Sequence, residues 1–179
     1  KLEGFIGNFK ATIRLKATSV DYSKCTGCGL CTTKCPQKKI PSEFNEGLGT
    51  RTAIFTPFPQ AVPNKPAIDK EHCNYYQKGK CKVCQKFCPT GAIEYDKPDE
   101  FITEEIGAVV VTTGFDVLKT EFFPEYGYGK YKDVINGLQF ERLASASGPT
   151  LGEIRRPSDG QIPKKIVFIA CCGSRDPAK

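Results

Sequence analysis

Eight of the ten cysteines in this 179-residue sequence fall into two runs that could bind metal. The first run is Cys25-Thr-Gly-Cys28-Gly-Leu-Cys31-Thr-Thr-Lys-Cys35-Pro36, and the second is the stretched set Cys73, Cys81, Cys84, Cys88 and Pro89. The spacing C-x2-C-x2-C-x3-C-P is typical of proteins with two [4Fe-4S] clusters, in which three thiolates of a run bind one cube and the fourth binds the other. The two runs therefore predict one-electron transfer chemistry.

The crossed pattern of two-cluster proteins assigns four cysteines to each predicted cluster. The predicted ligands of cluster I are Cys25, Cys28, Cys31 and Cys88. The predicted ligands of cluster II are Cys35, Cys73, Cys81 and Cys84. We expect Cys35 to open a short helix and to point toward the other cluster. Gly27 and Gly29 are expected to let backbone N–H groups approach the inorganic sulfurs.

Zinc and disulfide bonds are the alternatives for so many cysteines. Zinc sites close a tetrahedron with two separated pairs, and a third cysteine three residues on has no place in such a site. A disulfide framework is typical of short secreted chains with more than about 8% cysteine, and ten cysteines in 179 residues fall below that share. The sequence shows no secretory leader and no long apolar segment, so we expect a cytoplasmic protein without a membrane span.

The second run departs from the usual spacing, because seven residues separate Cys73 from Cys81 where two are common. A seven-residue loop closes at little extra entropic cost, so Cys73 can still reach its cluster. The loop is expected to change the cover over cluster II and thereby its reduction potential. His72, the only histidine in the chain, is expected to be solvated, with a ligand or proton-coupled role as the alternative.

Strand patterns flank the cysteine runs. Residues 9–16 alternate apolar and polar side chains, which is the period of a half-buried strand. Residues 100–105 predict a second strand, and the nearly continuous apolar run at 106–112 predicts a strand covered on both faces. The cysteine segment is therefore predicted to be inserted between two strands of an α/β protein.

The apolar run at 165–170 repeats the pattern of a buried strand. It leads into the vicinal pair Cys171 and Cys172, which we expect to close the strand as small apolar residues, with a redox-active dithiol as the alternative. An α/β unit normally continues from such a strand into a helix. The chain is therefore expected to be a fragment of a longer protein.

The net charge is +6, and part of it gathers around the second cysteine run. Lys78, Lys80, Lys82 and Lys86 lie in a stretch without acidic residues. They form either a solvated face or a docking patch for an acidic electron carrier such as a soluble ferredoxin. No nucleic-acid recognition fold accompanies the lysines, so nucleic acid is not an expected partner.

Several segments resemble the A-type subunit of heterodisulfide reductase. They are residues 41–63, Glu125-Tyr-Gly-Tyr-Gly129, Ala146-Ser-Gly-Pro-Thr150, Arg156-Pro-Ser-Asp-Gly160 and Gly173-Ser-Arg-Asp176. In addition, Val109-Val-Val-Thr-Thr-Gly114 resembles the "ATG" strand of thioredoxin-reductase-type flavoproteins, with Thr112 in place of the usual alanine. The likeness covers essentially the whole chain.

The resemblance implies an α+β fold, in which a two-cluster ferredoxin-like domain at 21–99 is inserted in a partial α/β FAD-binding domain of the thioredoxin-reductase kind. The strand segment 1–20 and residues 100–179 would belong to that flavoprotein domain, with Thr113 and Gly114 at the FAD. The G-x-G-x-x-G fingerprint is absent from the sequence, so the FAD diphosphate site is expected upstream of Lys1.

The resemblance also implies an oxidoreductase subunit that relays electrons between FAD and partner subunits or carriers by flavin-based electron bifurcation. The fragment alone is expected to catalyse nothing, because disulfide reduction belongs to a partner subunit in this family. The alternatives are a stand-alone ferredoxin-like electron carrier and the related flavoprotein subunit of a quinone-interacting complex in sulfur metabolism.

Overall fold

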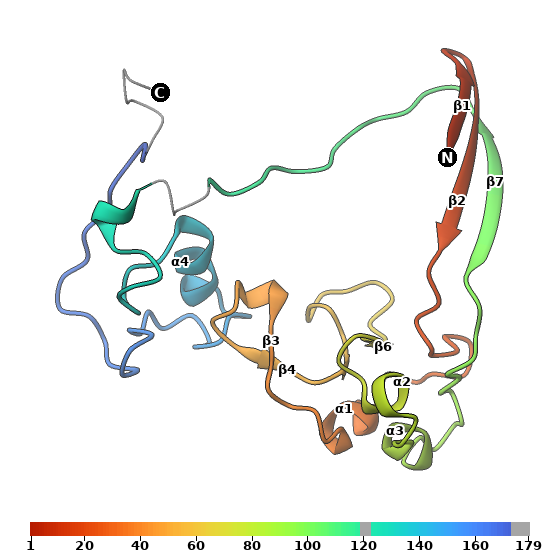
Figure 1. Cartoon of the computed structure of the whole chain (residues 1–179), viewed down its shortest axis with the longest axis horizontal. Coiled ribbons are helices and arrows are strands. Elements are labelled where there is room, and N and C mark those ends of the chain that lie inside the picture. Colours follow the sequence, from red (N-terminus) through yellow and green to blue (C-terminus); the bar gives the residue numbers. More distant parts are fainter. Residues whose placement is uncertain (119–122, 173–179) are drawn as a thin grey trace. The chain divides into compact units, whose positions relative to one another are not determined.

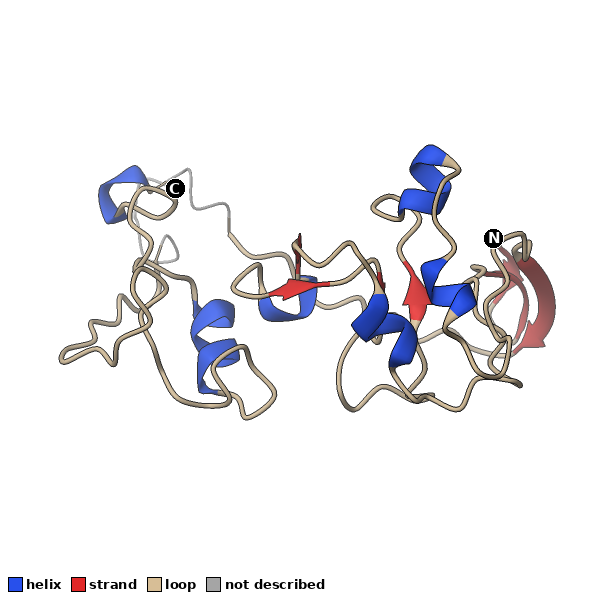
Figure 2. Ribbon diagram, turned by 90° about the horizontal axis from the view of Figure 1, so that it is seen from below, coloured by secondary structure: helices blue, strands red, loops and turns tan. Residues whose placement is uncertain are grey.

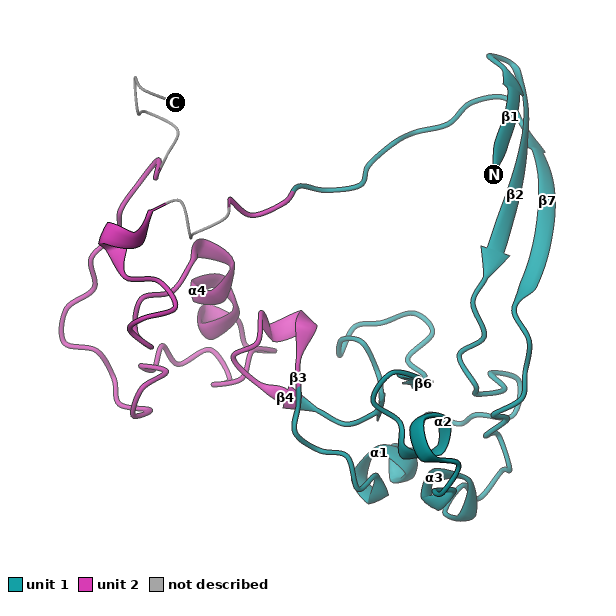
Figure 3. Ribbon diagram, in the orientation of Figure 1, with its two compact units in different colours: residues 1–40, 51–115 teal, residues 41–50, 116–179 magenta. Residues whose placement is uncertain are grey.

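The computed structural model describes residues 1–118 and 123–172. The chain divides into two compact units, coloured separately in Figure 3. Unit 1 contains residues 1–40 and 51–115, and unit 2 contains residues 41–50 and 116–179. In both units short helices and strands are joined by long loops (Figures 1 and 2). The fold is thus a small mixed α/β arrangement.

Unit 1 contains a three-stranded antiparallel sheet, which includes the first and the last strand of that unit. The sheet consists, in spatial order, of β1 (Leu2–Phe5), β2 (Asn8–Leu15) and β7 (Glu100–Ile106) (Figure 1). The register places Ile13 opposite Ile102 and Phe9 opposite Ile106. The strands predicted at 9–16 and 100–105 are confirmed. Both lie more exposed than a half-buried strand would.

The two strands that flank the cysteine segment are fastened together at its base. The Arg14 guanidinium forms an ion pair with the Asp99 carboxylate, whose other oxygen accepts a hydrogen bond from the Ala17 N–H at 2.8 Å. Residues 17 and 99 therefore bring the two ends of the cysteine segment to one place.

The prediction of strands at 106–112 and 165–170 is wrong. β7 ends at Ile106, and residues 107–115 are irregular and exposed. Residues 165–170 form no strand either. Val110 is 83% exposed and Val167 is 86% exposed, although both were expected to be covered. An apolar, β-branched run forms a strand only when another strand satisfies its backbone groups, and no strand among the described residues pairs with residues 107–112 or 165–170.

The cysteine segment of unit 1 consists of short elements. Its helices are α1 (Leu30–Lys34), α2 (Asn74–Lys78) and α3 (Val83–Lys86). Its antiparallel strand pair is β5 (Ile54–Phe55) with β6 (Ala67–Ile68). The strands β3 (Ile40–Pro41) and β4 (Thr50–Arg51), at which the chain passes from one unit to the other, form a further two-stranded sheet. No helix of the described residues is long and apolar enough to cross a membrane.

The core of unit 1 lies between these helices and strands. Its most deeply buried members are Val20, Ala53, Ile54 and Ala92, and four of the motif cysteines are buried with them. Val20 and Ile93 form an antiparallel bridge, which closes the segment just before the first run and just after the second. The apolar core and the cysteines thus form one packed body.

Unit 2 is built around α4 (Gly137–Ala144), with single-turn helices at η1 (Glu43–Asn45) and η3 (Pro124–Tyr126). A capping box starts α4: the Asn136 side chain accepts from the Gln139 N–H at 2.8 Å, and the Gln139 side chain accepts from the Asn136 N–H at 3.1 Å. The Arg142 guanidinium lies over the Phe44 ring at 4.0 Å. This contact and the Gln139 side chain, which donates to the Glu46 carbonyl, fasten residues 41–50 to α4.

Candidate metal centres

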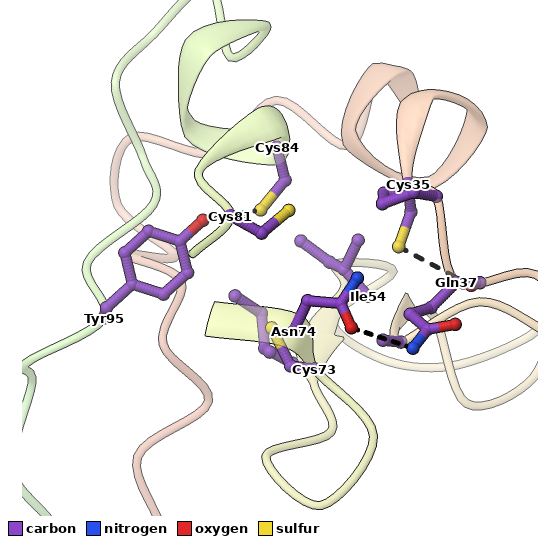
Figure 4. Close-up of a pocket in the computed structure, with 11 residues that line it drawn as sticks. Cys35, Gln37, Ile54, Cys73, Asn74, Cys81, Cys84 and Tyr95 are labelled. Atoms are coloured by element: carbon purple, nitrogen blue, oxygen red, sulfur yellow. Dashed lines mark hydrogen bonds between the residues drawn. The ribbon is translucent and has the colours of Figure 1, made fainter. Parts of the chain in front are cut away.

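Four cysteines surround one small cavity in unit 1 (Figure 4). They are Cys35 from the first run and Cys73, Cys81 and Cys84 from the second. The rest of the wall includes Ile54, Ile68 and Tyr95. The structure thus brings together the four residues that the crossed pattern assigns to cluster II.

Each of these cysteines is placed by the end of a helix. Cys35 ends α1, Cys73 precedes the first residue of α2, Cys81 lies between α2 and α3, and Cys84 lies on α3. The Gln37 side chain donates to the Asn74 side chain at 2.9 Å, which ties the segment after Cys35 to the start of α2 (Figure 4).

The expectation that Cys35 opens a helix is wrong, because α1 runs before it. Cys35 has φ −61° and ψ 129°, an extended conformation. Pro36 explains this, since the ring of a proline excludes the helical region for the preceding residue. The helix therefore stops at Cys35, and the chain turns there toward the second run.

The other four motif cysteines surround a second cavity in unit 1. They are Cys25, Cys28 and Cys31 from the first run and Cys88 from the second. Gly27 and Gly29 line the same cavity with φ of +75° and +74°, the left-handed region that favours glycine. The loop can therefore pass closely around the cavity, with Gly29 at the start of α1.

The thiols differ in their electrostatic surroundings. Burial raises the pKa of Cys31 and of Cys84. Burial also acts to raise the pKa of Cys88, but hydrogen bonds outweigh it and leave that pKa lowered. The Ala92 N–H donates to the Cys88 sulfur at 3.3 Å, and the Thr90 hydroxyl lies 3.6 Å from it. The Cys88 sulfur is thus surrounded by groups that stabilise a thiolate.

Each ring of four thiols is a donor set that an iron-sulfur cluster uses. Zinc requires each thiolate sulfur about 2.3 Å from the same atom. In an iron-sulfur cube each thiolate binds a different iron, so the four sulfurs stand farther apart. Rings of four cysteines with no oxygen ligand among them match that donor set.

A pair of nearly buried charges lies beside Cys73. The Arg51 guanidinium contacts the Asp69 carboxylate at 2.8 Å, with side-chain exposures of 10% and 13%. The same Asp69 oxygen lies 2.8 Å from His72 Nδ1. Burial acts to raise the pKa of Asp69, but the hydrogen bonds from Arg51 and His72 outweigh it and lower that pKa. His72 is exposed and lines neither cysteine cavity, as expected for a solvated residue.

The residue that sequence reasoning missed is Tyr95. Its hydroxyl lies 3.0 Å from the Cys84 sulfur (Figure 4). No ligand spacing points to this tyrosine. The available signal was its position two residues after Ile93, which puts it on the same side of an extended chain as that core residue.

All four lysines of the basic stretch are exposed: Lys78, Lys80, Lys82 and Lys86. Lys78 ends α2, Lys86 ends α3, and the other two lie in the link between these helices. They therefore lie close along the chain to Cys81 and Cys84 of the second run.

The residues assigned to FAD lie in an open stretch. Thr113 and Gly114 are exposed and irregular, and a Cβ added at Gly114 would meet nothing within 4 Å. Unit 2 has a cavity of about 610 Å³ that is lined by Val117, Tyr126 and Cys172 among others, but neither Thr113 nor Gly114 lines it. The predicted strand end before Cys172 is absent, and the segment at 173–176 lies outside the described residues.

A family model described as a 4Fe-4S binding domain matches residues 18–38. This match covers the whole first cysteine run. With the two rings of cysteines, it places the chain in the class of iron-sulfur electron-transfer proteins.

Curated relatives align with almost the entire chain. The A-type subunit of the H(2):CoB-CoM heterodisulfide,ferredoxin reductase from Methanothermobacter thermautotrophicus is 44% identical over 98% of the chain and 26% of the relative. The A-type iron-sulfur subunit of the CoB-CoM heterodisulfide reductase from Methanocaldococcus jannaschii is 47% identical over the same shares. The corresponding iron-sulfur subunit from Methanopyrus kandleri, the second of two A-type forms, is 48% identical over 99% of the chain and 26% of the relative.

The resemblance that the sequence motifs carry is therefore confirmed. The chain belongs to the family of A-type heterodisulfide reductase subunits, which are iron-sulfur oxidoreductase subunits, and corresponds to a segment of them. It spans about a quarter of the length of these relatives.

Proposed function

We propose that this segment holds two [4Fe-4S] clusters and relays single electrons within an A-type subunit like those of heterodisulfide reductases. The supporting observation is the separation of eight cysteines into two rings of four, each of which takes three from one run and one from the other. The ring for cluster I consists of Cys25, Cys28, Cys31 and Cys88. The ring for cluster II consists of Cys35, Cys73, Cys81 and Cys84.

Two helices connect the proposed cluster sites. Cys31 on α1 lines the first cavity, and Cys35, which ends α1, lines the second. Cys84 on α3 lines the second cavity, and Cys88, just after α3, lines the first. In each case the two cysteines lie four positions apart in the sequence, which is about one helical turn. The clusters would therefore be neighbours, which supports direct electron exchange between them.

We propose further that the clusters exchange electrons with FAD in the longer protein. Residues 21–99 would be a ferredoxin-like insertion in a thioredoxin-reductase-like domain that includes 1–20 and 100–179, with Thr113 and Gly114 near the flavin. Relatives are named as reductases of both a heterodisulfide and ferredoxin. A name that contains two electron acceptors supports flavin-based electron bifurcation in these relatives, and we propose the same process, with partner subunits, for the longer protein to which this chain belongs. Thiol ligands that need a reducing environment support the cytoplasm.

The exposed lysines beside cluster II support an acidic electron carrier as an external partner. Lys78, Lys80, Lys82 and Lys86 present positive charge without a neighbouring acid in sequence. Such a patch raises the encounter rate with a negatively charged protein such as a soluble ferredoxin. A stand-alone carrier is the second candidate, because unit 1 alone contains both cysteine rings. Homology that extends through unit 2 favours the larger enzyme.

The proposal is tested by the metal content of the chain reconstituted without oxygen. We expect about eight iron and eight sulfide per chain and a brown absorption that dithionite bleaches. A folded, colourless protein that saturates with one or two zinc ions would refute the iron-sulfur assignment.

Ligand variants test the crossed arrangement. Cys35→Ser is expected to alter the same EPR signal as Cys84→Ser, whereas Cys28→Ser alters the other signal, since Cys35 and Cys84 line one cavity and Cys28 lines the second. If Cys35→Ser removed only the signal that Cys28→Ser removes, each run would bind its own cluster.

A further inference from the structure

The extra residues between Cys73 and Cys81 form a helix rather than a slack loop. Five of them make α2 (Asn74–Lys78), and Gly79 ends the helix with φ +66°. α2 carries two adjacent tyrosines, Tyr75 and Tyr76, whose rings pack edge to face at 5.4 Å. Both side chains pack against the core of unit 1. The insertion thus adds aromatic side chains beside cluster II.

Both tyrosines of α2 hold a third, Tyr95. The Tyr75 ring stacks on the Tyr95 ring with 4.0 Å between centroids and 26° between planes. The Tyr76 hydroxyl donates to the Tyr95 carbonyl oxygen and lies 2.6 Å from the Ser19 hydroxyl. Stacking fixes the plane of the ring, and the hydrogen bond fixes the backbone that carries it. Tyr95 therefore has one well-defined position.

In this position the Tyr95 hydroxyl reaches the Cys84 sulfur at 3.0 Å (Figure 4). Tyr95 is only 5% exposed, and Cys84 is buried as well, so water competes little for this contact. A hydrogen bond to a charged sulfur is stronger in such surroundings than at the surface. When Cys84 is an iron ligand its sulfur carries no proton, so the tyrosine hydroxyl is the donor.

We propose that Tyr95 is a positioned hydrogen-bond donor that raises the reduction potential of cluster II, and that the α2 insertion exists to hold it. This inference rests on the proposed function. One electron from an external reductant enters the cluster, and no bond is made or broken at the tyrosine. The added electron increases negative charge on the cluster and its thiolates, so the hydroxyl stabilises the reduced form more than the oxidised form.

The test compares Tyr95→Phe with Tyr22→Phe in the cluster-loaded chain. Both variants lose one hydroxyl from a tyrosine that packs against the same core, but Tyr95 is the one whose hydroxyl contacts Cys84. An EPR-monitored redox titration gives the potential of each cluster. We expect Tyr95→Phe to lower the reduction equilibrium constant of cluster II roughly tenfold, which is about 59 mV for a one-electron couple. Cluster I in this variant and cluster II in Tyr22→Phe should keep their wild-type potentials.

Tyr75→Leu tests the role of α2. Loss of the stacking partner frees the Tyr95 ring, so the potential of cluster II should fall in the same direction and by less. An unchanged cluster II potential in Tyr95→Phe, or an equal shift of both clusters, would overturn the inference. Iron and sulfide are measured in every variant. If Tyr95→Phe binds eight of each and its cluster II potential is unchanged, only the role of Tyr95 is refuted. If the wild-type chain does not bind iron, the proposed function itself is refuted.

Discussion

Asp69→Asn should loosen the segment that carries Cys73. One oxygen of the Asp69 carboxylate accepts hydrogen bonds from the Arg51 guanidinium and from the His72 ring. Its other oxygen accepts the N–H groups of Glu71 at 3.0 Å and His72 at 3.3 Å. The Asp69 carbonyl oxygen in turn accepts the Cys73 N–H at 3.0 Å. One carboxylate thus organises the turn that leads into Cys73, a proposed cluster ligand.

The magnitude follows from which contacts the amide can keep. The asparagine oxygen still accepts the two backbone N–H groups, so the loss is the charge-assisted contact to Arg51, about 1.5–3 kcal/mol. The side-chain exposures of 10% for Arg51 and 13% for Asp69 favour the upper half of this range, because removing one partner leaves the other charge poorly solvated. Since each 1.4 kcal/mol is a factor of ten, this upper half makes local opening about 40- to 140-fold more frequent.

The assay is the bleaching of the loaded chain by a ferrous chelator, whose rate follows the population of the opened segment when closing is fast. Asp96→Asn is the matched control, because Asp96 is exposed and undergoes the same chemical change. We expect Asp69→Asn to bleach at least tenfold faster than wild type and Asp96→Asn to match wild type. Equal rates in the two variants would refute the role of the buried ion pair.

The same ion pair predicts a pH dependence. The hydrogen bonds to Asp69 lower its folded-state pKa despite its burial, so its stabilising contribution is present above the unfolded pKa and lost as the pH falls through the lower folded value. Asp69→Asn should therefore bleach faster than wild type throughout about pH 5 to 8. The difference between the two rates should narrow only as the pH falls below about 3.9, the ordinary value for aspartate.

Two further predictions concern the surface and unit 2. Lys78→Glu with Lys80→Glu should slow reduction by an acidic ferredoxin and flatten its dependence on ionic strength, because rim charges act mainly on encounter. Stopped-flow rates across a salt series measure this, and a flat dependence in the wild type would leave the lysines as a solvated face. Asn136→Ala should destabilise α4 by about 0.5–2 kcal/mol through loss of its cap, seen as faster hydrogen exchange at Gln139 and Phe140. Unchanged exchange there would mean that packing alone starts the helix.

The spacing of the two runs divides the eight cysteines into two groups, and the same two groups line the two cavities of unit 1; that they bind clusters stays a prediction. Cys31 lies on α1, and Cys35 is the extended residue that ends this helix before Pro36; the two line different cavities. The relative placement of these two cysteines can be predicted from a few neighbouring residues, because helix geometry and the steric effect of proline determine it.

Features that depend on distant partners could not be predicted in this way. The apolar runs at 106–112 and 165–170 have the pattern of buried strands. Beyond Ile106, which ends β7, they nevertheless lie exposed, because no described strand pairs with them. The contact between Tyr95 and Cys84 depends on stacking by Tyr75 from an insertion twenty residues earlier in the chain. The hydrophobic period and the residue spacing of a segment reflect that segment alone, so they do not predict its contacts with distant parts of the chain.

The helices α1 and α3 each carry a cysteine of one ring and lead into a cysteine of the other. A cluster bound in either ring would therefore order a helix that also positions a cysteine of the other ring. The conformational entropy lost when that helix is ordered would not have to be lost again when the second cluster binds. If both rings hold clusters as proposed, loading of this segment with iron and sulfide is expected to be cooperative, with half-filled chains as the least populated species. Under iron limitation such chains would then be either empty or complete, and few would accept an electron without passing it on.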